Sequence, residues 1–84
     1  MKHAGELALD QLEPLLVRIR ALPGLTEKKR GVFYRKARSF LHFHEDPRGL
    51  FGDIRAADER DFDRFDVTIS GDALVAAAEA RLKA

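Results

Sequence analysis

Two histidines and an aspartate lie close together in the middle of this 84-residue chain, between Phe40 and Arg55. His42 and His44 are two positions apart, so in a β-strand they point to the same face of a sheet. Two imidazoles and a carboxylate such as that of Asp53 form a ligand set for transition metals. An imidazole beside a carboxylate can also carry a proton. The segment therefore offers a candidate metal or acid/base site.

Two strands joined by a tight turn would position these side chains. The run Asp46-Pro47-Arg48-Gly49 matches a type I turn, which favours Asp first, Pro second and Gly fourth. Strands over residues 39–45 and 50–56 would pair as an antiparallel hairpin, in which opposed residues share a face. We expect Asp53, opposite His42, to raise the pKa of that imidazole. The predicted cross-strand pairs are Glu45–Leu50, His44–Phe51, Phe43–Gly52, His42–Asp53, Leu41–Ile54 and Phe40–Arg55.

A further strand over residues 31–36 would precede this hairpin. A two-residue loop at Ala37-Arg38 predicts that Phe33 pairs with His42 and Tyr34 with Leu41. The almost wholly apolar face should lie against the helices: Val32, Tyr34, Leu41, Phe43, Leu50, Gly52 and Ile54. The face turned away from the helices, called the outer face below, should carry the binding residues: Phe33, Arg35, Phe40, His42, His44, Phe51, Asp53 and Arg55.

The outer face has several interpretations. It could bind a partner or a second copy of the chain, or be covered by residues 58–65 through Phe62 and Phe65. Its rings and arginines could stack bases and hold phosphates. His42, His44 and Asp53 could bind a metal or transfer a proton, with His3 as a reference histidine outside the site.

A basic cluster and an acidic cluster follow one another along the chain. The basic cluster could attract phosphates, or the two clusters could face each other as solvated surface. We favour the second interpretation because the formal net charge is only +1. The basic cluster is Lys28, Lys29, Arg30, Arg35, Lys36 and Arg38, and the acidic cluster is Asp58, Glu59, Asp61, Asp63 and Asp66.

The remaining patterns predict the rest of the fold. Apolar residues at helical spacing predict a helix over residues 6–22, ended by Pro23-Gly24, and Pro14 requires either a later start or a kink. Residues 25–30 read as a polar connector and residues 65–69 as a short fourth strand. Ser70 or Asp72 can cap a final helix. The expected fold is a single α+β domain over residues 1–84. It has two layers: an N-terminal helix, a three- to four-stranded antiparallel sheet and a C-terminal helix, with the helices on one sheet face.

The sequence resembles the MmcQ/YjbR-like small bacterial proteins over about residues 15–55. The resemblance rests on Ala21-Leu22-Pro23-Gly24-Leu25, the strand from Gly31 to Lys36 and a phenylalanine-rich second strand. It implies a frataxin-like α+β fold and argues against a dedicated enzyme. The first hairpin lacks the family's usual glycine, and no catalytic residue can be carried over.

We therefore expect a small bacterial binding domain that acts through its outer face, with self-association as one form of that binding. Alternatives are nucleic-acid or polyanion binding, which we do not favour, and a metal or acid/base site at His42, His44 and Asp53. No cofactor, catalytic residue or membrane partner is expected. The chain has no cysteine, which fits a cytoplasmic location.

Overall fold

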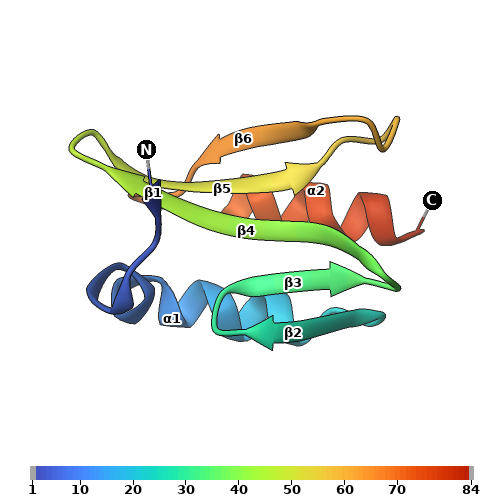
Figure 1. The fold of residues 1–84 in the computed structure, drawn as a ribbon, viewed down its shortest axis with the longest axis horizontal. Coiled ribbons are helices and arrows are strands. Elements are labelled where there is room, and N and C mark those ends of the chain that lie inside the picture. The colour runs from blue at the N-terminus through green and yellow to red at the C-terminus, as the bar shows by residue number, and fades with distance from the viewer. Residues whose placement is uncertain (1, 84) are drawn as a thin grey trace.

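The computed structural model describes residues 2–83, which form two layers, an antiparallel sheet and a pair of helices packed on one of its faces (Figure 1). This confirms the α+β class, with two helices and an antiparallel sheet. Among the described residues no helix is long and apolar enough to cross a membrane. The elements are β1 (Lys2–His3), α1 (Glu6–Arg20), β2 (Leu25–Lys29), β3 (Val32–Arg35), β4 (Arg38–Asp46), β5 (Gly49–Arg55), β6 (Phe62–Asp66) and α2 (Asp72–Lys83).

The sheet has two more strands than the largest number predicted. Its order is β2-β3-β4-β5-β6, and the short β1 pairs with β4 beyond the stretch that β3 covers. The residues predicted to form a polar connector form the edge strand β2. An edge strand is hydrogen-bonded to one neighbour only, here β3, so a single apolar contact with the core is enough to hold it. Leu25 supplies that contact by packing against the core. The last strand begins at Phe62, three residues earlier than predicted, and Ile69 is almost fully exposed.

Both helices bury one apolar stripe against the sheet. Helix α1 begins well before Pro14 and carries that proline inside it, so the prediction of an early start holds. Proline has no N–H, so the carbonyl four residues earlier receives no intrahelical bond from it. The Ser70 hydroxyl accepts the backbone N–H of Asp72 and caps α2, as predicted. Helix α2 packs closely on β5, one of the two strands of the candidate site, through Leu74 against Gly52.

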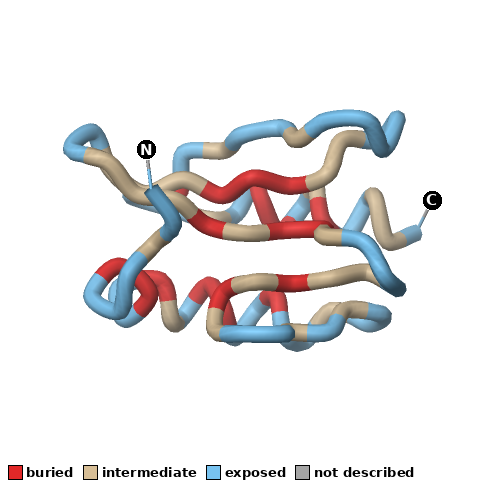
Figure 2. The backbone as a smooth tube through the Cα atoms, in the orientation of Figure 1, coloured by how far each residue is buried: buried red, intermediate tan, exposed pale blue. Residues whose placement is uncertain are grey.

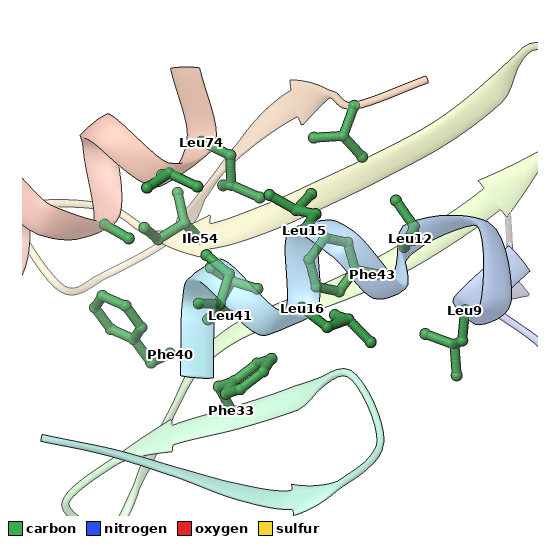
Figure 3. Packing of buried hydrophobic residues seen from close by; sticks show 14 residues of the cluster. Leu9, Leu12, Leu15, Leu16, Phe33, Phe40, Leu41, Phe43, Ile54 and Leu74 are labelled. Carbon is green, nitrogen blue, oxygen red and sulfur yellow. The ribbon is translucent and has the colours of Figure 1, made fainter. Parts of the chain in front are cut away.

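The core lies between the helices and the middle of the sheet (Figure 3). Leu41 and Ile54, opposite each other on β4 and β5, are fully buried, as is Leu74 of α2. A Cβ at Gly52 would lie 2.6 Å from Leu74 Cδ2, so glycine is what lets α2 approach β5 this closely. Burial is concentrated along the central strands and on the inward helix faces (Figure 2).

The β4–β5 hairpin has the predicted register. Five predicted pairs occur, from Glu45–Leu50 at the turn to Leu41–Ile54, and His42 lies opposite Asp53. The turn signal and the apolar alternation agree here, and either one alone would fix the same pairing.

The predicted β3–β4 register is wrong. Phe33 pairs with Leu41 and Tyr34 with Ser39, so Phe40 is an extra residue in a β-bulge. The turn residue Lys36 adopts a positive φ of 58° in place of the expected loop at Ala37-Arg38. The bulge puts Phe40 beside Leu41 in the core instead of on the outer face.

Candidate metal site on the outer face

Five of the eight predicted outer-face residues lie where they were expected, and three do not. Phe33 and Phe40 are only 1% and 3% exposed because the bulge turns both rings into the core. Arg35 shares the face of Phe33, and its Nη1 donates to the Arg81 carbonyl of α2. The residues on the outer face are His42, His44, Phe51, Asp53 and Arg55.

His42, His44 and Asp53 converge as the sequence predicted. One ligand atom from each lies within 4.8 Å of the other two. His44 Nδ1 is 3.0 Å from Asp53 Oδ2, and His42 Nε2 is 3.9 Å from the same oxygen. The register of β4 and β5 fixes this arrangement, because it places Asp53 opposite His42 and diagonal to His44, two residue pairs along on the same face.

Asp53 is the one charged residue fully buried among residues 2–83, and Arg64 of β6 is its partner. Arg64 Nε and Nη2 donate to Oδ1 and Oδ2, each at 2.8 Å, in a two-pronged pair. These bonds hold the pKa of Asp53 below its usual value, so it is a carboxylate at neutral pH. Arg64 thereby satisfies a buried charge that would otherwise be costly.

The pKa values of both imidazoles shift downward, although Asp53 does raise that of His42 as predicted. Burial is the largest cause for His42 and for His44, and it outweighs the attraction of Asp53. The Arg64 guanidinium beside Asp53 lowers both values further. The two imidazoles are therefore neutral at pH 7, and their free ring nitrogens can act as ligands.

His44 Nδ1 has an unusual environment. This nitrogen is buried and lies at contact distance from Asp53 Oδ2, but the angle of that contact does not meet hydrogen-bond geometry. No other described group forms a hydrogen bond with it. A buried ring nitrogen without a partner is uncommon in a folded protein. A cation between this nitrogen and the carboxylate oxygen would satisfy both.

His3 also belongs to the cluster, so it is not the remote reference that the sequence suggested. Strand β1 pairs His3 with His44, and the centroids of these two rings are 4.7 Å apart. All three histidines of the chain thus lie together. A two-residue strand leaves no periodic signal, which is why the sequence did not reveal this contact.

Strand β6 adds two residues to the cluster: Phe62, which the sequence offered as a cover for the outer face, and Arg64, which the sequence reasoning missed. The Phe62 ring packs against His42 in an edge-to-face arrangement with centroids 5.0 Å apart, and the Arg55 guanidinium lies over the Phe62 ring, 4.7 Å from its centroid. Strand β6 extends the sheet beside β5 instead of folding over it. Of the open alternative that residues 58–65 cover the outer face, the structure has the contact of the Phe62 ring with His42, while Phe65 packs against the core. Strand β6 is short and polar apart from its two phenylalanines, so its sequence gave no clear period that would have placed Arg64.

Much of the basic cluster is bound within the protein. Arg30 forms ion pairs with Glu6, Asp10 and Glu13 of α1. Arg38 pairs with Glu59 of the acidic cluster, in line with the favoured interpretation. These arginines would have to give up those partners before they could bind a phosphate.

No protein-family model, curated protein or solved structure matches this chain. The resemblance to the MmcQ/YjbR-like proteins therefore stays a prediction. The function has to be inferred from the cluster itself.

Proposed function

We propose that this chain is a small binding domain that acts through its outer face, and that its ligand there is a divalent transition metal such as zinc. His42, His44 and Asp53 would be the ligands. The observation that carries the proposal is the convergence of two neutral imidazoles and a buried carboxylate within 4.8 Å. Two imidazoles and a carboxylate leave further coordination positions for water.

The spacing of the ligand atoms supports this proposal. Two ligands on a tetrahedral zinc ion, each about 2.0–2.1 Å from it, are roughly 3.3 Å apart. His44 Nδ1 and His42 Nε2 lie 3.0 and 3.9 Å from Asp53 Oδ2, on either side of that value. A common ion would require side-chain rotations that draw together the three ligand atoms, which now lie within 4.8 Å of one another.

The protonation states support it as well. A metal ion needs neutral histidines and an ionised carboxylate, and otherwise binding must release protons. Burial lowers the pKa of His42 and His44, and Arg64 lowers that of Asp53. The cluster is therefore in its ligating form at neutral pH.

Isothermal titration calorimetry with zinc chloride tests the proposal. We expect saturable one-to-one binding that is lost in the double variant His42→Ala/His44→Ala and strongly weakened in Asp53→Asn. Glu79→Gln removes a carboxylate from the exposed side of α2 and is the control that should bind like the parent. Absence of saturable binding, or equal binding by the double variant, would remove the metal function.

Other uses of the outer face have less support. The aromatic and basic platform expected for nucleic acid loses Phe33, Phe40 and Arg35 to the helix side of the sheet. Of its remaining arginines, Arg55 stacks on Phe62 and Arg64 is held by Asp53. Self-association, cytoplasmic location and the absence of an enzymatic activity stay predictions, and solution mass measured across concentration decides the first.

A further inference from the structure

A single oxygen of Asp53 lies at the centre of the cluster. Oδ2 is the Asp53 oxygen that lies 3.9 Å from His42 Nε2 and 3.0 Å from His44 Nδ1, and it also accepts a hydrogen bond from Arg64 Nη2 at 2.8 Å. The metal proposed above would use this oxygen. The guanidinium of Arg64 therefore holds the atom that the metal needs.

Arg64 can leave Asp53 more easily than Asp53 can move. The Arg64 side chain is 48% exposed, whereas that of Asp53 is 8% exposed. Both side-chain hydrogen bonds of Arg64 to residues 2–83 go to Asp53, and its guanidinium carbon lies 6.0 Å from the centroid of the Phe51 ring. Rotation of the guanidinium into water therefore breaks no other side-chain hydrogen bond among the described residues.

We propose that Arg64 is an internal competing cation that sets the metal affinity of this site. The proposal rests on the metal function proposed above. In the metal-free protein Arg64 neutralises Asp53, so the ligand set of two neutral imidazoles and a paired carboxylate has no net charge. A divalent ion that binds there displaces Arg64 or remains close to it and is repelled. At about 5 Å in a water-like dielectric, that repulsion weakens binding roughly tenfold.

The alternative role for Arg64 predicts the opposite sign. Hydrogen bonds to a ligating carboxylate often fix its orientation, and loss of such a partner typically weakens metal binding about 10–100-fold. A competing cation must instead weaken binding by its presence. Measurement of zinc affinity without Arg64 therefore separates the two roles.

Arg64→Met removes the charge and keeps most of the aliphatic length, and Arg38→Met is the matched control. Arg38 has a similarly exposed side chain at 55% and one ion pair, with Glu59, away from the cluster. We expect Arg64→Met to bind zinc about tenfold more tightly than the parent, with a lower melting temperature in the metal-free form because Asp53 is then buried and unpaired. Arg38→Met should keep the parent zinc affinity.

Arg64→Lys provides a second measurement that does not depend on the stability of the methionine variant. Lysine keeps the charge but loses the two-pronged bond. It should bind zinc more weakly than Arg64→Met does. If the parent binds zinc and Arg64→Met binds it with the same or lower affinity, the role proposed for Arg64 is wrong, but the proposed metal function is not. No zinc binding by the parent and by Arg64→Met would overturn the metal function and this inference together.

Discussion

His42 lies opposite Asp53 across strands β4 and β5, yet its imidazole is neutral at pH 7 despite the neighbouring carboxylate. Its Nε2 is 3.9 Å from Asp53 Oδ2, too far for a hydrogen bond. The carboxylate is engaged by Arg64, and burial dominates the pKa of His42. The pair that looked like a proton-transfer dyad is therefore part of a neutral, ligand-ready cluster.

The protein should lose stability on mild acidification. His42 and His44 have pKa values below the 6.5 of an unfolded histidine, so below pH 6.5 the unfolded chain binds more protons than the folded one. The contribution of these two histidines to the free energy of unfolding is fully present above pH 6.5. It is lost as the pH falls from 6.5 toward their lowered pKa values in the folded state. Urea unfolding at pH 7.5 and pH 5.5 measures this loss.

The double variant His42→Gln/His44→Gln is the control for the pH effect. Glutamine does not titrate, so the decrease in unfolding free energy between the two pH values should be smaller than in the parent. A variant that loses as much stability as the parent would assign the pH dependence to other groups.

Phe40→Ala tests the bulge in β4. Phe40 is 3% exposed in the core, so its truncation should lower the free energy of unfolding by about 3–5 kcal/mol. Phe51 is a partly exposed phenylalanine on the outer face, and Phe51→Ala should cost clearly less. Urea unfolding of both variants provides the comparison. Equal losses, or a larger loss for Phe51→Ala, would favour the unbulged register, in which Phe40 lies on the outer face.

Gly52→Ala tests how closely α2 packs on β5. The added methyl group would lie 2.6 Å from Leu74 Cδ2 and 3.2 Å from Phe43 Cε1. Overpacking of this kind costs about 1–3 kcal/mol, and urea unfolding should show that loss. Gly5→Ala is the control, because its nearest neighbour, Glu45 Oε2, is 3.4 Å away. A Gly52→Ala variant as stable as Gly5→Ala would contradict the close approach.

The hairpin of β4 and β5 could be predicted from the sequence because two independent signals agree there. Asp46 and Gly49 define the turn, and alternation separates the inner and outer residues on both strands. The preceding hairpin offered neither signal. Its turn uses Lys36 at a positive φ, which a non-glycine residue seldom adopts, and Phe40 adds one residue to the strand.

The candidate site was predictable only in part, for a related reason. His42, His44 and Asp53 sit on the well-specified hairpin and were placed correctly. His3 comes from a two-residue strand and Arg64 from an edge strand, and these elements are too short or too polar to show a clear period. Tertiary pairing, which no local pattern encodes, brings both to Asp53 and His44.

The imidazole nitrogens report metal binding most directly. In ¹⁵N-labelled protein at pH 7.5, long-range ¹H–¹⁵N spectra resolve Nδ1 and Nε2 of each histidine during a zinc titration. We predict that one equivalent of zinc shifts His44 Nδ1 and His42 Nε2, the nitrogens nearest Asp53 Oδ2, and that Asp53→Asn reduces both shifts. Unchanged spectra, or shifts confined to His3, would contradict the metal site.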